Sequence, residues 1–218
     1  MSHIANKIIA KDIALSDAFT NSRYRIDAFQ RDYRWQHKQI DALISDLSTS
    51  FLSNYEVGNT LANVDKYDSY YMGPIVLCED EGYLSVVDGQ QRLTSFSLLL
   101  IFLQHLQKSL SLSEDCYRDL SAYIFITKGG KRTFTLDVSS RNKVMRGRFD
   151  LNSPDKSLSL SDDDETDRDS LTNLIACYDD IRHIFPNELK KADVLPLFIE
   201  WLLLKVVLVE IRAFSMDN

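Results

Sequence analysis

The stretch Val86-Val87-Asp88-Gly89-Gln90-Gln91-Arg92-Leu93-Thr94 decides the fold, because a single glycine turn in it joins two apolar elements. Residues 70–80 and 83–88 are rich in β-branched and aromatic residues around a polar turn, which is typical of a β-hairpin. Residues 90–108 are apolar nearly all round, which predicts a buried helix. We therefore expect this stretch to present the first residues of a buried helix at the end of a strand.

The residue types in this turn suit a phosphate group. Free backbone N–H groups and the positive end of the helix dipole favour an anion at a helix N-terminus. A cation in the first turn is unfavourable for the helix by about 0.3–1 kcal/mol, so Arg92 at that position indicates an anionic partner. Gln90 and Gln91 each add an amide donor and acceptor.

A purely structural interpretation fits the same residues. Asp88 followed three residues later by Gln91 matches a capping box, in which both side chains only satisfy backbone groups of the helix. Arg92 would then pair with a structural carboxylate. The residues of the turn alone leave the two interpretations equally open.

A second cluster, Ala28-Phe29-Gln30-Arg31-Asp32-Tyr33-Arg34-Trp35, lies before an amphipathic helix expected at residues 37–52. Taken one at a time, its aromatic side chains are more typical of a hydrophobic core than of a ligand site. It repeats, however, the Gln-Arg pair of the turn, as Gln30 and Arg31. This repetition favours the interpretation in which both clusters bind phosphate.

Composition limits the class of protein. The chain has 218 residues, of which 44% are hydrophobic and 26% charged, as in a soluble globular protein. Its most apolar stretch, residues 98–103, is far shorter than the roughly 20 residues of a membrane span, and no early apolar segment is typical of a secretory signal. Three scattered cysteines suit neither a disulfide framework nor a metal site. We therefore expect a cytoplasmic protein with reduced thiols.

The net charge of −7 is unevenly distributed. Residues 155–169 carry seven acids and two bases, and their serine-rich, aromatic-free composition predicts a mobile surface loop. Residues 128–148 carry seven bases and one acid, so an acidic protein still offers a basic run to a polyanion. The alternative for this run is an ordinary solvated face. The bases considered for nucleic-acid binding are Arg141, Lys143, Arg146 and Arg148.

The whole pattern predicts an α+β fold, with a small mixed sheet that bears the two motif loops and a mainly helical subdomain after it. We expect residues 1–110 to form the core that carries both motifs, and residues 111–218 to form the helical remainder with a final strand. The other predicted elements are helices at 8–20, 113–126, 139–149, 169–185 and 187–204, strands at 23–26, 133–138 and 206–214, and a loop at 54–69.

Three motifs in a fixed order resemble one known family. Residues 29–35 (FQRDYRW), 71–77 (YMGPIVL) and 86–95 (VVDGQQRLTS) are similar to the N-terminal domain of the GmrSD-type restriction proteins. This large bacterial family is marked by its DGQQR motif and is also called domain of unknown function 262. The resemblance is specific over the first hundred residues and weaker after them. Thr94-Ser95 stands where the family has two threonines, a departure that keeps a hydroxyl.

The resemblance implies a fold like that of the ParB/sulfiredoxin superfamily, in which a Gly-x-x-Arg turn at a helix N-terminus binds nucleotide phosphates. Residues 89–92 match this pattern. It also implies nucleoside triphosphate hydrolysis coupled to cleavage of modified foreign DNA, as a defence against phage. The family's nuclease belongs to a separate C-terminal domain with an HNH-like motif, which this sequence lacks. We expect an NTPase fragment without nuclease activity, with DNA as a partner of the full-length protein.

On this hypothesis the turn performs the chemistry. Gly89 lets the backbone approach the phosphates, and Arg92 with the helix N-terminus neutralises them. Asp88 caps the helix, or holds Mg²⁺ or the attacking water, and Gln91 orients water or a phosphate oxygen. The predicted catalytic residues are Asp88, Gln91 and Arg92.

Further contacts complete the predicted nucleotide site. Arg31, from the second cluster, supplies another positive charge, and Gln30 or Gln90 is an alternative for the orienting amide. The identity of the nucleoside triphosphate is left open. The residues expected to contact it are Gln30, Arg31, Gly89, Gln90, Arg92 and Thr94.

Two other functions remain open. A nucleotide-gated interaction domain would close a dimer on nucleotide binding, with hydrolysis incidental. A DNA-reading module without turnover would follow the DNA backbone with the basic run from Lys131 to Arg148, and its affinity would depend steeply on salt. We rank nucleotide hydrolysis first, the gated interaction domain second and DNA reading third.

Overall fold

The structure is a computed structural model, and it describes residues 8–20, 23–26, 32–80, 83–128, 130–154, 160 and 168–214. Its helices are α1 (Leu15–Thr20), α2 (His37–Leu52), α3 (Gln90–Ser109), α4 (Ser121–Ile124), α5 (Ser139–Asp150), α6 (Arg168–Ile184) and α7 (Leu195–Lys205), with 3-10 helices η1 (Leu61–Lys66) and η3 (Asn187–Lys190). Its strands are β1 (Ile9–Ala14), β2 (Tyr24–Arg25), β3 (Tyr70–Asp80), β4 (Tyr83–Asp88), β5 (Phe125–Lys128), β6 (Lys131–Phe134), β7 (Leu136–Asp137) and β8 (Val206–Phe214).

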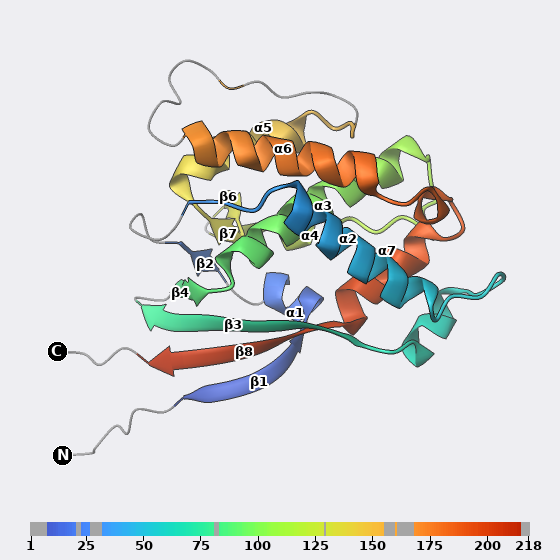
Figure 1. Ribbon diagram of the computed structural model, residues 1–218, viewed down its shortest axis with the longest axis horizontal. Coiled ribbons are helices and arrows are strands. Elements are labelled where there is room, and N and C mark those ends of the chain that lie inside the picture. Colours follow the sequence, from blue (N-terminus) through green and yellow to red (C-terminus); the bar gives the residue numbers. More distant parts are fainter. Residues whose placement is uncertain are drawn as a thin grey trace.

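A six-stranded mixed sheet organises the chain, as the predicted α+β class requires (Figure 1). Its strand order is β1-β8-β3-β4-β2-β7. β8 runs antiparallel to β1 and parallel to β3, β3 and β4 form the predicted hairpin, and β4, β2 and β7 run parallel to one another. β5 and β6 pair separately. Because β8 lies between β1 and β3, residues from both sides of position 110 share this sheet.

The helices lie on one side of the long strands β3, β8 and β1 (Figure 1). α3 runs through the helical layer, and its side chains from Leu93 to Gln107 are buried, which confirms the prediction of a buried helix. α2 packs against α6 and turns its apolar stripe inward, including Ile40 and Phe51. Within the described residues, none of the helices is both long and apolar enough to cross a membrane.

Strand pairing overrides the helix predicted at residues 8–20. Residues Ile9–Ala14 form β1 and pair with β8, and only Leu15–Thr20 are helical. β1 gives hydrogen-bond partners to one edge of β8, whose backbone groups would otherwise stay open. That edge belongs to the other end of the chain, so the local pattern of residues 8–20 does not contain the reason for the strand.

Glutamine side chains of α3 hold most of residues 113–126 out of the predicted helix. Gln107 accepts from the backbone N–H of Arg118 and donates to its carbonyl, each at 3.0 Å. Gln104 accepts from the backbone N–H of Leu120 at 2.9 Å. These bonds satisfy backbone groups that a helix would otherwise pair. Only Ser121–Ile124 are helical, and the chain continues as β5.

Two other predicted elements are divided, and the loop predicted at 54–69 contains the 3-10 helix η1. Residues 133–138 are shared between β6, which pairs with β5, and β7, which joins the main sheet. Residues 187–204 are divided into η3 and α7, and Pro196 lies in the first turn of α7, where a missing N–H leaves no bond unmade. The acidic loop predicted at 155–169 falls mostly outside the described residues. The predictions at 23–26, 37–52, 139–149, 169–185 and 206–214 agree with β2, α2, α5, α6 and β8.

A polar cluster lies inside the core beside α3. The imidazole of His105 donates from Nε2 to the carbonyl of Phe149 at 3.0 Å and accepts at Nδ1 from the hydroxyl of Tyr178 at 2.9 Å. The guanidinium of Arg148 lies 4.0 Å from the centre of the Tyr178 ring and pairs with Asp179 at 3.1 Å. Burial is the largest influence on the imidazole, and it lowers the pKa of His105 below its ordinary value.

We expect acid to destabilise the fold through His105. Its pKa is lowered in the folded chain, whereas in the unfolded chain it has the ordinary value of about 6.5. As the pH falls through this range, the unfolded chain binds a proton that the folded chain does not, so the free energy of unfolding decreases. Urea denaturation at about pH 8 and about pH 5.5 measures this decrease.

The matched variant is His105→Gln, whose amide can donate to the Phe149 carbonyl but does not titrate. It should lose less stability on acidification than the wild type, because the other histidines are common to both proteins. Equal losses in the two proteins would show that His105 is not the titrating group.

Candidate functional site

The carboxyl ends of three parallel strands meet at one edge of the sheet. Tyr24 of β2 pairs with Leu84 of β4 and with Leu136 of β7, so the three strands point the same way. β4 leads into α3, β7 leads into α5, and the second motif follows β2. Ligands of open sheets with parallel strands bind at this end of the strands. We call residues 88–92 the DGQQR turn and residues 32–36 the motif loop, and we take this edge as the candidate site.

Gly89 makes the DGQQR turn possible. It precedes α3 with a φ of +94°, in the left-handed region where a side chain is strained. A Cβ atom added to Gly89 would lie 2.7 Å from Cγ2 of Ile75, which is fully buried in β3. Conformation and packing therefore both require glycine here. The turn presents the first N–H groups of α3, which have no acceptor within the helix.

The DGQQR turn does not form the capping box that its sequence also fits. The residue at the N-terminal cap of α3 is Gly89, and it makes no side-chain cap. Asp88 is the exposed last residue of β4. The capping-box interpretation is therefore wrong, and the carboxylate of Asp88 stands beside the turn rather than on the helix N–H groups.

Gln91 joins the DGQQR turn to the motif loop. Its Oε1 accepts from the backbone N–H groups of Arg34, at 2.9 Å, and Trp35, at 3.3 Å. Its Nε2 donates to the carbonyl of Asp32 at 2.9 Å. The two motifs thus lie side by side. Both polar atoms of Gln91 are engaged with the loop, so Gln91 positions the loop, and its role in orienting water stays a prediction.

The residues of the second motif that were expected to contact the nucleotide are Gln30 and Arg31. Both lie outside the described residues, so the structure carries no contact for either.

Arg92 lies over the backbone of β3. Its Nη1 donates to the carbonyl oxygen of Pro74, and a Cβ atom added to Gly73 would lie 3.2 Å from the same nitrogen. Gly73 has a φ of +110° and falls where the pairing of β3 with β8 is irregular. Within the part of the chain that the structure describes, Arg92 forms no ion pair with a carboxylate. The structural carboxylate that the alternative interpretation requires is absent from these residues.

Gln90 is the amide of the turn whose side-chain oxygen has no partner among the described residues. Its side chain is half-buried, and its Oε1 is buried and meets no hydrogen-bond donor among the described residues. A buried acceptor without a donor is unfavourable, and such atoms are rare in folded proteins. A hydroxyl, an amino group or a metal-bound water would satisfy it.

Thr94 and Ser95 connect α3 to neighbouring elements. Thr94 is 1% exposed, and its Oγ1 accepts from Nη1 of Arg141 in α5 at 3.3 Å. Thr94 is thus buried and bonded to Arg141, and its contact with nucleotide stays a prediction. The hydroxyls of Ser95 and Tyr33 share a hydrogen bond of 2.9 Å, which the sequence analysis did not identify. Adjacent hydroxyl residues in an otherwise apolar helix were the signal that could have indicated these contacts.

The basic run divides into buried and exposed members. Arg141 is 5% exposed and Arg148 is 1% exposed, and Arg148 pairs with Asp179. A buried guanidinium cannot contact a DNA backbone, which corrects the role predicted for these two residues. Lys143 and Arg146 are exposed. Of the four predicted bases, only these two belong to the surface of α5.

Replacing Gly89 by alanine tests the packing against Ile75. Gly58 is the matched control, because its φ is +92° and an added Cβ would meet no atom within 4 Å. We expect Gly58→Ala to lower the free energy of unfolding by about 1–2 kcal/mol through backbone strain alone. Gly89→Ala adds crowding to the strain and should cost about 2–5 kcal/mol. Chemical denaturation measures both values, and equal losses would mean that Ile75 moves aside freely.

Comparison with known proteins places the chain in a family. The family model "GmrSD restriction endonuclease, N-terminal domain" matches residues 15–218. None of the curated proteins matches the chain. The matched range runs from α1 to the end of β8 and beyond, and it includes the DGQQR turn and the motif loop. The chain therefore belongs to the family of GmrSD restriction endonuclease N-terminal domains.

Proposed function

We propose that this domain binds a nucleoside triphosphate with Mg²⁺ at the DGQQR turn and hydrolyses it. One observation carries the proposal: the left-handed Gly89, the N-terminus of a buried 20-residue helix and the side chain of Arg92 coincide at the carboxyl ends of parallel strands. Helix N-termini favour bound anions through their free N–H groups and dipole. A glycine at the cap lets phosphate oxygens approach the backbone closely.

The placement of Arg92 supports a phosphate ligand. An arginine in the first turn opposes the helix dipole by about 0.3–1 kcal/mol, and no carboxylate among the described residues offsets it. One nitrogen is anchored on the carbonyl of Pro74, and the guanidinium has further N–H donors for an anion. We propose that Arg31, which precedes the motif loop in the sequence, supplies the second positive charge.

Asp88 suits a role at the metal. It is exposed at the end of β4, next to Gly89. Mg²⁺ in nucleotide sites is held by one or two carboxylates together with phosphate oxygens and water. A single carboxylate therefore fits, and the described residues include no cluster of three or more metal-ligating side chains that would form a separate cage. When bound, the metal would neutralise charge on the phosphates during hydrolysis. Gln90 is proposed to accept a hydrogen bond from a water at this site.

The family to which the chain belongs is that of a restriction endonuclease domain. We propose that nucleotide hydrolysis here is coupled to cleavage of modified foreign DNA by a separate nuclease domain, and that DNA is a partner of the full-length protein. Lys143 and Arg146 are the exposed bases that α5 offers. Two bases neutralise few phosphates, so we do not assign the main DNA contact to this helix.

Calorimetric titration of the four ribonucleoside triphosphates with Mg²⁺ tests the binding. The wild type should bind at least one of them. Arg92→Ala removes charge-assisted hydrogen bonds of about 1.5–3 kcal/mol each, so the loss of two should weaken binding about a hundredfold or more. Lys191→Ala is the control, because it removes one charge from an exposed residue outside the turn.

Circular dichroism of each variant separates loss of binding from loss of fold. A folded wild type that binds none of the four nucleotides would reject the proposal. Equal nucleotide affinities of Arg92→Ala and Lys191→Ala would show that the phosphates are not bound at the DGQQR turn.

Asp88→Asn keeps the shape of the side chain and removes its charge. Nucleotide affinity in the presence of EDTA should not fall, because the lost carboxylate would only have repelled the phosphates. The gain in affinity from Mg²⁺ and the Mg²⁺-dependent release of phosphate should both fall about tenfold or more. Undiminished hydrolysis by the variant would exclude Asp88 from the metal. A nucleotide-dependent rise in mass by light scattering without phosphate release would instead favour a gated interaction domain.

A further inference from the structure

We propose that one face of α6 is a positioning element of the nucleotide site, because it fixes the backbone of the motif loop. This inference rests on the function proposed above. The motif loop has no regular secondary structure, so its backbone groups need partners elsewhere. Most of those of residues 32–35 find them in side chains from two helices. One is α3, through Gln91, and the other is α6.

Side chains of α6 hold both backbone groups of Tyr33. The N–H of Tyr33 donates to Oγ of Ser170 at 3.0 Å, and this bond is buried. The carbonyl of Tyr33 accepts from Nδ2 of Asn173 at 3.3 Å. One turn further along α6, the thiol of Cys177 donates to the carbonyl of Trp35 at 3.1 Å.

These residues form one stripe along α6. Positions 170, 173 and 177 recur at spacings of three and four, which places their side chains on one face of a helix. Asp180 continues the stripe and forms a hydrogen bond of 3.0 Å with Nδ1 of His37, the first residue of α2. α6 therefore bonds to the chain at intervals from Tyr33 to the start of α2.

Together with Gln39 of α2, the two helices leave the loop little freedom. Gln91 accepts from the N–H groups of Arg34 and Trp35, and Gln36 donates to the side chain of Gln39. Every backbone N–H from residue 33 to residue 36 thus has a side-chain acceptor. A loop that is ordered before its ligand arrives spares the ligand the entropy of ordering it. The motif loop is bonded to the DGQQR turn through Gln91, so the order of the loop bears on the nucleotide site proposed at that turn.

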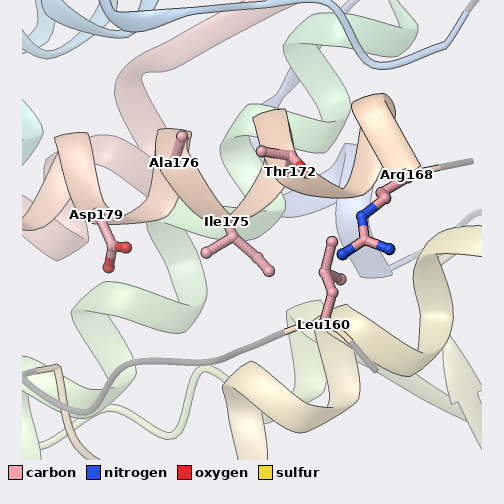
Figure 2. A pocket seen from close by; sticks show the side chains of 6 residues that line it. All are labelled: Leu160, Arg168, Thr172, Ile175, Ala176 and Asp179. Carbon is pink, nitrogen blue, oxygen red and sulfur yellow. The ribbon is translucent and has the colours of Figure 1, made fainter. Parts of the chain in front are cut away.

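The opposite face of α6 provides an internal control. It borders a pocket whose lining includes none of the residues of the stripe, and Figure 2 shows the side chains that line it. Thr172 is exposed on this face, so a substitution there changes the same helix without removing a bond to the loop. The residues that line this pocket are Leu160, Arg168, Thr172, Ile175, Ala176 and Asp179.

Two measurements on the 218-residue chain test the proposal, each on the double variant Ser170→Ala/Asn173→Ala. Hydrogen exchange at the amides of residues 33–36, without nucleotide, reports the loop itself. It should become about tenfold faster or more, because a buried N–H loses its acceptor. The dissociation constant of the tightest-binding nucleoside triphosphate, by calorimetry with Mg²⁺, should rise about tenfold or more.

The calorimetric stoichiometry separates positioning from mere destabilisation. A variant of which a fraction is irreversibly misfolded would bind fewer molecules of nucleotide with an unchanged dissociation constant. Reversible unfolding also raises the apparent dissociation constant, and urea denaturation of the variant measures how much of it is unfolded. A variant whose loop is displaced would bind the full number more weakly. Thr172→Ala should match the wild type in exchange, stoichiometry and dissociation constant.

Three results would overturn the inference in different ways. Unchanged exchange at residues 33–36 in the double variant would show that α6 does not fix the backbone of the motif loop. Faster exchange with an unchanged dissociation constant would show that α6 fixes the motif loop but that this does not affect nucleotide binding. A wild-type chain that binds no nucleoside triphosphate would overturn the proposed function and the positioning role together, and that result is seen before any variant of α6 is made.

Discussion

The contact between the backbone of Gly89 and the side chain of Ile75 is the constraint on which the site depends. β4 is paired with β3 up to Asp88, and the buried helix α3 begins only two residues later. The left-handed turn at Gly89 makes this abrupt change of direction, and the packing against Ile75 leaves no room for a Cβ atom there. Ile75 lies in β3 between β4 and β8, so the turn cannot shift without the sheet. This fixes where α3 begins and how it is rotated. Successive residues of a helix point about 100° apart, so Gln91 reaches the motif loop while Arg92 lies over β3.

α3 is more than the centre of the core, because its polar side chains organise the irregular parts of the chain. Gln91 and Ser95 bind the motif loop, and Gln104 and Gln107 bind the backbone around residues 118–120. His105 binds the carbonyl of Phe149 in the last turn of α5. Segments without secondary structure must satisfy their backbone groups by other means. One central helix does this with three glutamine amides for two separate segments, the motif loop and the chain around residues 118–120.

The predictability of each element follows from where its determinants lie. α2, α3 and the β3–β4 hairpin carry their periodicity and turn residues within their own sequence, and they were predictable from it. β1 and residues 113–126 are decided by β8 and by glutamines of α3, which are distant in the chain. The burial of Arg148 depends on Asp179, because a buried cation is tolerated only with a partner. The sequence displays the charge of such a residue but not its partner.

The site shows the same division between local and distant determinants. The proximity of the two motifs was suggested by their shared Gln-Arg pair and by the resemblance to a family. The sequence did not predict that Gln91 binds the motif loop while the side-chain oxygen of Gln90 has no partner among the described residues, because this depends on the rotation of α3 that Gly89 imposes. The stripe of Ser170, Asn173 and Cys177 was also not predictable, because the sequence of a helix does not show which backbone groups its small polar side chains bind.

Two side chains of the DGQQR turn, Gln90 and Arg92, bear on the kind of ligand that the turn would accept. Every N–H from residue 33 to residue 36 has an acceptor, yet beside that loop Oε1 of Gln90 has no donor and Arg92 has no carboxylate among the described residues. The two groups need opposite partners, because Gln90 requires a donor and Arg92 an acceptor. A DNA backbone offers phosphate acceptors and would leave Gln90 unsatisfied. The hydrated magnesium–triphosphate complex proposed as the ligand would offer both, with phosphate oxygens for Arg92 and metal-bound waters for Gln90. The two side chains are therefore consistent with the proposed ligand, whereas a bare phosphate backbone would match only Arg92.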